Sequence, residues 1–144
     1  MTTIAQLLGT KPQGTWSVSP AASVYQAIEI MADKQIGALL VLEEGRVVGI
    51  VSERDYARKV ILQRKPSHET TVREIMTSPV FTVRPDQHIE DCMEIMTARR
   101  IRHLPVLRDE ELLGVISIGD VVKALLAERE TRIEQLEHYI TGRT

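Results

Sequence analysis

The chain has 144 residues, of which 43% are hydrophobic and 26% are charged. This composition is typical of one compact domain or two small packed halves with a real apolar core. The formal net charge is −2, which argues against a general nucleic-acid-binding protein, because such proteins carry a basic excess. No apolar run approaches the roughly 20 residues that span a bilayer, and Met1–Gln6 lacks the features of a secretory signal. We therefore expect a cytoplasmic protein that binds neither membrane nor nucleic acid.

Cysteine and histidine give no sign of a metal or redox site. Cys92 is the single cysteine, so no intrachain disulfide can form, and its place on an apolar helix face predicts a buried, inert thiol. His68, His88 and His138 show no metal-ligand spacing with one another or with Cys92, and we predict no metal site.

An internal repeat organises the chain. The segment from Val18 to Leu62 repeats 65 residues later without a gap. The opening segment Thr2–Leu8 resembles Thr70–Met76 at an offset of 68, so three extra residues fall within residues 9–14, a loop by composition. We predict repeat 1 over residues 2–64, repeat 2 over 65–127 and a C-terminal helical extension over 128–144.

Each repeat has the same predicted elements in the same order. A short opening helix is followed by an extended segment that ends at a proline, a longer helix, two apolar strands joined by a tight turn, and a last helix. In repeat 1 the extended segment is 16–20, the long helix starts near Val24, the strands are 38–42 and 47–52, and the last helix follows Ser52. In repeat 2 the opening helix is 71–76, the extended segment is 80–85, the long helix starts near Ile89, the strands are 104–107 and 112–117, and the last helix follows Ser117.

The apolar pattern predicts an α/β fold. The strands are almost continuously apolar, so both faces of each sheet should be covered, and one repeat alone would leave a sheet face bare. We therefore expect two pseudo-symmetric helix–strand–helix–hairpin–helix repeats packed through their sheets. The charged stretch 128–139 carries a narrow stripe of Ile133 and Leu136, with Ile140 just beyond. It is interpreted as a helix continuing from Val121, a helix that packs on a partner chain, or a solvated helix end.

A Gly-x-x-Ser-x-x-Asp pattern ends the second strand of both repeats, as Gly49, Ser52 and Asp55 and again as Gly114, Ser117 and Asp120. Ser-x-x-Asp at the start of a helix is close to a capping box, which is a sufficient structural explanation for each copy. The same groups also suit a nucleotide, because a carboxylate accepts hydrogen bonds from a ribose diol and a helix N-terminus favours phosphate.

The duplicated pattern, the prolines Pro20 and Pro85 before the long helices and the segment Ile101–Val106 make the chain resemble tandem CBS-domain proteins (Bateman modules) from about Thr2 to Leu126. The resemblance implies two CBS repeats that bind an adenosine-containing ligand in clefts between them. The ligand would be AMP, ADP or ATP, or else NAD or S-adenosylmethionine. It also implies a homodimer that regulates a protein of unknown identity.

The resemblance also assigns residues to the two clefts. Asp120 and Asp55 would bind ribose, with Ser117 and Ser52 near phosphate or ribose. One cleft would combine Gly37, Ala38, Ser117, Gly119 and Asp120, with Arg102 and His103 at the phosphates. The other would combine the segment 101–103 with Ser52, Arg54 and Asp55, and the segments holding Thr15 and Thr77 to Val80 would line the base pockets.

One further interpretation stays open. The chain could be a purely structural dimerisation module whose turns only cap helices. An enzyme is not expected, since no Ser-His-Asp order, metal-ligand cluster or P-loop is visible. Because Arg102 and His103 occur in one repeat only, the cleft with Ser117, Gly119 and Asp120 is predicted to be the better mononucleotide site.

Overall fold

The computed structural model describes residues 1–11 and 15–140, and these form two compact units. The first unit joins Met1–Gln13 to Thr82–Thr144, and the second is the continuous segment Gly14–Phe81. The N-terminal piece therefore belongs with the C-terminal half of the chain. The extra residues predicted within 9–14 fall partly on residues 12–14, which lie outside the described residues.

The unit Gly14–Phe81 contains a three-stranded sheet in the order β1-β2-β3. β1 (Ser17–Val18) runs parallel to β2 (Ala38–Glu43), which forms an antiparallel hairpin with β3 (Arg46–Ser52). Glu44 and Gly45 both have positive φ at the hairpin turn, the conformation that a two-residue type I′ turn requires. The helical segments are α2 (Val24–Lys34), α3 (Glu53–Tyr56), the π-helical turn η1 (Ala57–Ile61) and α4 (Val72–Ile75).

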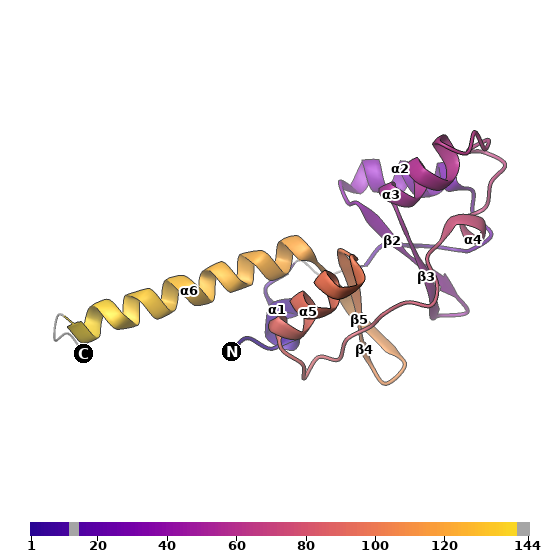
Figure 1. Ribbon diagram of the computed structural model, residues 1–144. Helices are drawn as coiled ribbons and strands as arrows, with labels where there is room; N and C mark the ends of the chain where they lie inside the picture. Colours follow the sequence, from indigo (N-terminus) through magenta and orange to yellow (C-terminus); the bar gives the residue numbers. More distant parts are fainter. Residues whose placement is uncertain (12–14, 141–144) are drawn as a thin grey trace. The chain divides into compact units, whose positions relative to one another are not determined.

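The other unit contains α1 (Ile4–Gly9), α5 (Ile89–Arg99), the hairpin of β4 (His103–Arg108) and β5 (Glu111–Ser117), and α6 (Ile118–Ile140) (Figure 1). The strand expected within 80–85 is reduced to one parallel bridge between Val83 and Val106. Val83 donates to Pro105 O at 3.0 Å and accepts from Leu107 N at 2.9 Å. Pro105 stands where repeat 1 has Leu40, whose N–H donates to Trp16 O at 3.3 Å, and a proline has no N–H for that bond.

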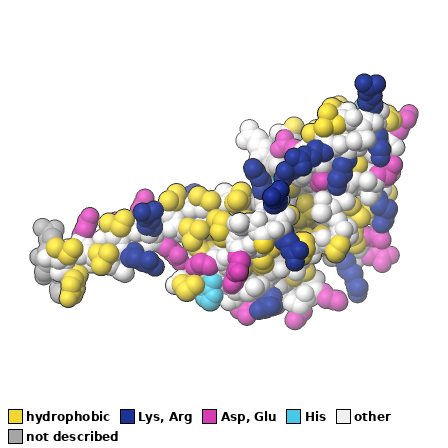
Figure 2. Space-filling model, in the orientation of Figure 1, with side chains coloured by type: hydrophobic (Ala, Val, Ile, Leu, Met, Phe, Trp, Pro, Cys, Tyr) yellow, Lys and Arg dark blue, Asp and Glu magenta, His cyan; other side chains and the backbone are white. Residues whose placement is uncertain are grey.

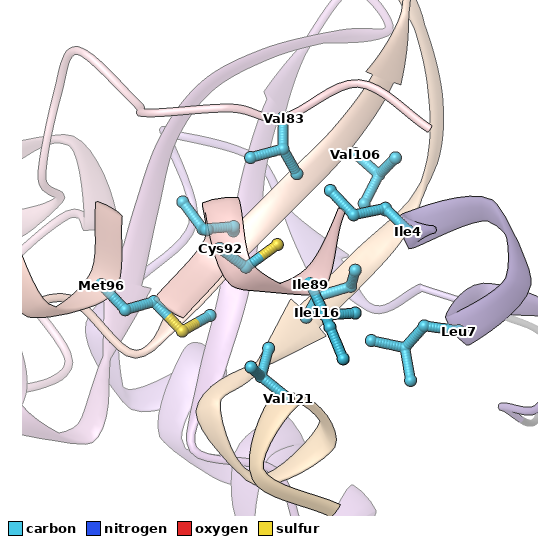
Figure 3. Packing of buried hydrophobic residues seen from close by; sticks show 10 residues of the cluster. Ile4, Leu7, Val83, Ile89, Cys92, Met96, Val106, Ile116 and Val121 are labelled. Carbon is cyan, nitrogen blue, oxygen red and sulfur yellow. The ribbon is translucent and has the colours of Figure 1, made fainter. Parts of the chain in front are cut away.

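The opening helices are exchanged between the repeats. Ile4 and Leu7 of α1 are buried in one core with Ile89, Cys92 and other residues of repeat 2 (Figure 3). Val72 and Ile75 of α4 are buried in the second core, with repeat 1. The compact units therefore differ from the division 2–64 and 65–127, because the apolar face of each opening helix packs on the other repeat's hairpin and long helix.

This exchange explains the glycine of the repeated pattern. A Cβ on Gly49 would lie 2.6 Å from Sδ of Met76, which directly follows α4, and a Cβ on Gly114 would lie 2.9 Å from Cδ2 of Leu8 in α1. Met76 and Leu8 are equivalent at the offset of 68 that relates the opening segments. The absence of a Cβ at each glycine thus leaves room for Met76 or Leu8 to pack on the second strand of the hairpin.

The last helix of repeat 2 runs from Ile118 to Ile140 without a break. The predicted extension 128–144 is therefore a continuation of this helix over its described part, as the interpretation of a helix continuing from Val121 predicts. Neither α6 nor any other helix in residues 1–11 and 15–140 is long and apolar enough to cross a bilayer.

Candidate functional site

Both Ser-x-x-Asp turns form reciprocal capping boxes between a strand and a helix. Ser117 N donates to Asp120 Oδ2 at 2.9 Å, and Asp120 N donates to Ser117 Oγ at 3.2 Å. The equivalent bonds between Ser52 and Asp55 measure 3.0 and 3.1 Å. The capping interpretation is therefore satisfied at both turns, and any ligand role comes in addition to it.

Lys11 is an unpredicted member of the Asp120 turn. Its Nζ lies 2.6 Å from Asp120 Oδ2 and donates at 2.6 Å to Val115 O. Burial opposes ionisation of Asp120, but the hydrogen bonds from Lys11 and Ser117 outweigh it and hold the pKa below its ordinary value. Both bonds end on Oδ2, and within residues 1–11 and 15–140 no hydrogen bond ends on Oδ1 of Asp120. The sequence held no sign of this contact, since Lys11 is an isolated cation in a loop.

Arg102 and His103 lie beside the same turn. His103 is opposite Ser117 in the β4–β5 register, and Arg102 O accepts a hydrogen bond from Ile118 N at 2.8 Å. Burial and the charges of Lys11 and Arg102 lower the pKa of His103, although Asp120 partly opposes them. The lowered pKa favours the neutral imidazole, so the cation in direct contact with Asp120 is Lys11.

The Asp55 turn has the same capping bonds but a different set of neighbours. Lys59 Nζ lies 3.0 Å from Asp55 Oδ1, and Thr77 Oγ1 donates weakly to the same oxygen at 3.4 Å. Oδ2 accepts from the backbone N–H and the hydroxyl of Ser52. Both carboxylate oxygens are thus engaged, in contrast to Asp120. The sequence analysis did not predict Lys59 as a site residue, because an (i, i+4) Asp–Lys pair is typical of an ordinary ion pair on a helix surface.

The remaining predicted residues occupy different surroundings. Ala38 is opposite Ser52 in the β2–β3 register, and Gly37 O accepts from Glu53 N at 3.0 Å, so both lie at the Asp55 turn. Gly119 is exposed in the first turn of α6. Arg54 and Thr15 are exposed and Val80 is half-buried, and no described hydrogen bond ties these three to an aspartate. That each cleft combines both repeats stays a prediction.

A groove of about 1100 Å³ opens beside Asp120. Its walls come from the N-terminal residues, α1, Lys11, Glu90 of α5 and one side of α6, and Asp120, whose side chain is 23% exposed, is among the lining residues. No cluster of three or more His, Cys, Asp or Glu side chains that could hold a metal ion occurs in the described part of the chain.

Known proteins resemble this chain in sequence and in fold. The family model for the CBS domain matches residues 14–62 and 72–127. The mitochondrial CBS domain-containing protein CBSX3 of Arabidopsis thaliana is 38% identical over 150 residues, which cover 98% of this chain and 73% of that protein. A solved structure from Burkholderia ambifaria, of a CBS-domain protein to which a role in signal transduction is attributed, is 51% identical with a TM-score of 0.85 and covers 88% of this chain and 95% of its own.

A further solved structure contains ligands. The CBS domain pair of protein MJ0100, in complex with 5′-methylthioadenosine and S-adenosyl-L-methionine, is 25% identical with a TM-score of 0.78 and covers 88% of this chain and 98% of its own. The two family matches fall on the two halves of the internal repeat. This chain belongs to the CBS-domain family as a tandem pair of CBS repeats.

Proposed function

We propose that the chain is a regulatory module that binds a phosphorylated adenosine ligand at the Asp120 turn and passes the binding event to a partner protein. The observation that carries this proposal is the arrangement at Asp120: an ionised carboxylate whose Oδ1 accepts no hydrogen bond from the described residues, next to the Lys11 ammonium and a groove that Asp120 lines. The ligands of the MJ0100 domain pair support the adenosine part of this ligand, and the phosphate is proposed from Lys11.

Asp120 is suited to the ribose. Its lowered pKa keeps the carboxylate ionised at any physiological pH, and Oδ1 can accept a hydroxyl hydrogen bond without breaking the capping box on Oδ2. At the Asp55 turn a ribose would have to displace Lys59 or Thr77 from Oδ1. We therefore propose Asp120 as the stronger ribose site and Asp55 as the weaker one.

Lys11 and Arg102 favour a phosphorylated ligand over a neutral or cationic one. An ammonium has three N–H donors, and Lys11 uses two of them on Asp120 and Val115, which leaves the third for a phosphate. The same two cations would repel the sulfonium of S-adenosylmethionine. AMP, ADP, ATP and NAD are therefore the proposed ligands, with Ser117 and Gly119 at the helix start and His103 as a neutral hydrogen-bonding group.

The rest of the site is proposed on the family resemblance. Gly37 and Ala38 would let a purine approach the backbone, Arg54 would serve the phosphates at the Asp55 turn, and Thr15, Thr77 and Val80 would line base pockets. A homodimer, a cytoplasmic location and the absence of catalysis belong to the same proposal. Nucleotide turnover by the purified protein that is lost in Asp120→Ala would contradict the last of these.

A structural dimerisation module is the second candidate, and the complete capping boxes at both turns favour it. Under that function Asp120→Ala would cost about 1 kcal/mol of stability, as loss of a cap does, and no ligand effect would exist. Loss of stability alone therefore cannot separate the two candidates.

A matched variant separates them. Asp91 holds the same third position in the capping box of α5, in the same unit as Asp120, and accepts from His88 N at 2.9 Å. Thermal unfolding of the wild type, Asp120→Ala and Asp91→Ala is measured with and without AMP, ATP, NAD and S-adenosylmethionine. Ligands that bind only the folded state raise the melting temperature, so the nucleotides should stabilise the wild type and Asp91→Ala but not Asp120→Ala. An equal shift in all three, or a shift in none, would overturn the proposal.

A further inference from the structure

A second groove, of about 530 Å³, lies in the same unit as Asp120 and shares no lining residue with the groove at Asp120. It is lined by Thr3 and Ala5 at the start of α1, by residues 84–86 and by residues 107–109 at the tip of the β4–β5 hairpin. We call it the Arg108 groove. None of its residues is assigned to the nucleotide, so it is a candidate for a second, independent site.

The internal repeat identifies the equivalent place in the other unit. There α4 is the exchanged helix, and its Arg73 is the equivalent of Ala5 at the offset of 68. Arg73 donates its backbone N–H to Pro20 O at 3.0 Å. Ala5 donates in the same way to Pro85 O, also at 3.0 Å, and Pro85 is the equivalent of Pro20 at the offset of 65. The two backbones therefore match at this point, and the two places differ in their side chains.

An ion pair occupies the place in the Gly14–Phe81 unit. Arg73 of α4 pairs there with Glu43, the last residue of β2. The equivalent of Glu43 is Arg108, so repeat 2 has an arginine in place of the acid and an alanine in place of the base. The short side chain of Ala5 leaves space beside Arg108. The Arg108 groove is thus the position that the ion pair fills in the other unit.

The replacement leaves a cation without a counterion. Arg108 is exposed, and its guanidinium forms no hydrogen bond or ion pair with the described residues. Arg84 is the second cation of the groove, but its Nε already donates to Asp86 at 3.1 Å. Asp109 is also a lining residue, so the groove has two charges of each sign. Figure 2 likewise shows both acidic and basic side chains in the region of the β4–β5 hairpin, whose place Figure 1 gives.

Apolar surface accompanies the free guanidinium. Ala5 is exposed, and Pro85 and Leu107 are half-buried, whereas the equivalent Pro20 in the other unit is buried. A ligand that covers these side chains gains from their burial as well as from the charge of Arg108.

We propose that the Arg108 groove binds an exposed segment of a partner protein in which an acidic side chain is adjacent to an apolar one. The partner's carboxylate would pair with Arg108 in bidentate fashion and restore, with reversed polarity, the ion pair of the other repeat. The apolar neighbour would cover Pro85 and Leu107. A polyanion such as a nucleic acid does not suit the groove, because the lining has no net positive charge.

Nuclear magnetic resonance of the arginine Nε–Hε groups tests the proposal. The probe is acetyl-Leu-Glu-Leu-amide, and the matched controls are acetyl-Leu-Gln-Leu-amide and sodium acetate, all at constant ionic strength. The Glu peptide should shift the Arg108 signal with a dissociation constant at least about tenfold lower than either control, because only it offers both a carboxylate and apolar side chains. Arg58, which is exposed in the other unit, reports non-specific binding and should not shift. Equal shifts of Arg108 and Arg58, or equal affinities for the Glu peptide and a control, would overturn the proposal.

A substitution that supplies the carboxylate from within the chain gives the second test. Ala5→Glu places an acid at the exposed position from which Arg73 reaches its partner in the other unit, and Ala5→Gln has the same size without the charge. Ala5→Glu should shift the Arg108 signal in the absence of peptide and abolish the response to the Glu peptide. Ala5→Gln should leave the Arg108 signal in its wild-type position. If Ala5→Glu leaves that signal unchanged and binds the peptide as the wild type does, the Arg108 groove is not the binding site.

Discussion

Substitution of Lys11 by methionine should destabilise the protein measurably. The ammonium holds Asp120 Oδ2 and Val115 O, each at 2.6 Å, and methionine keeps most of the apolar stem while removing both bonds. Hydrogen bonds to charged groups contribute about 1.5–3 kcal/mol. The side chains of Lys11 and Asp120 are 29% and 23% exposed, so solvent screening brings the expected loss to about 1–2 kcal/mol.

The assay is urea and thermal unfolding followed by far-ultraviolet circular dichroism. A loss of this size should lower the melting temperature by roughly 2–8 °C for a chain of this length. Arg58→Met is the control, since it removes an exposed positive charge from the other unit and should change stability by less than about 0.5 kcal/mol. If Lys11→Met is no less stable than Arg58→Met, the Lys11–Asp120 contact does not stabilise the fold and the reasoning fails.

Acidification gives a second readout of the same contact. The pKa of Asp120 is lower in the folded protein, so its contribution to stability is complete above the ordinary carboxyl pKa and is lost as the pH falls through the folded value. Removal of Lys11 should raise this pKa and reduce that acid-dependent loss. If the stability of Lys11→Met falls at low pH as much as that of the wild type, Lys11 is not a cause of the lowered pKa of Asp120.

Three further predictions concern other sites. Burial, and after it the neighbouring positive charges, lower the pKa of His103, so its contribution to stability is complete above the ordinary histidine pKa and is lost on acidification below it. In His103→Gln the free energy of unfolding, measured with urea at several pH values, should fall less on acidification than in the wild type. An equal fall in both proteins would refute this role of His103. Gly49→Ala should lower the free energy of unfolding by about 1–3 kcal/mol, measured by thermal unfolding, because the new Cβ meets Met76. The additional substitution Met76→Ala should recover part of this loss. A Gly49→Ala variant as stable as the wild type would contradict this packing. The Cys92 thiol, whose pKa burial raises to about 11, should react with an aromatic disulfide only after unfolding, and rapid native labelling would contradict its burial.

The repeat made the elements predictable. Two copies of each pattern gave two independent chances to recognise the hairpins and the long helices, and the four strands of the two hairpins form within two residues of the expected bounds. Local signals were sufficient for these elements, because an apolar run on each side of a tight turn specifies a hairpin by itself. The short strand expected within 80–85 is reduced to one bridge because Pro105 has no N–H for the bond that Leu40 makes in repeat 1.

The exchange of α1 and α4 could not be predicted in the same way. Their buried faces, such as Ile4 and Val72, mark them as helices that pack, but an apolar face does not specify which core it covers. A trace of the exchange is present in the sequence, where the offset changes from 65 to 68 between the opening segments and the rest of the repeat. Nothing in that change identifies the new neighbours.

The candidate site was predictable only where it is local. Ser52, Asp55, Ser117 and Asp120 belong to short motifs whose capping geometry follows from sequence spacing. The contact of Lys11 with Asp120 joins residues 109 positions apart, and it exists because α1 packs on the core of repeat 2. Long-range ion pairs of this kind leave no pattern in a single sequence. Arg102 and His103 predicted that the two clefts differ, but the contribution of Lys11 to that asymmetry emerged only from the structure.

Calorimetric titration with AMP tests the central claim most directly, because it measures binding at the Asp120 turn without reference to stability. The wild type and Asp91→Ala should bind AMP with a saturable heat, and Asp120→Ala should lose that heat while it remains folded by circular dichroism. Equal binding by Asp120→Ala, or no binding by the wild type, would contradict the account of this turn as a nucleotide site.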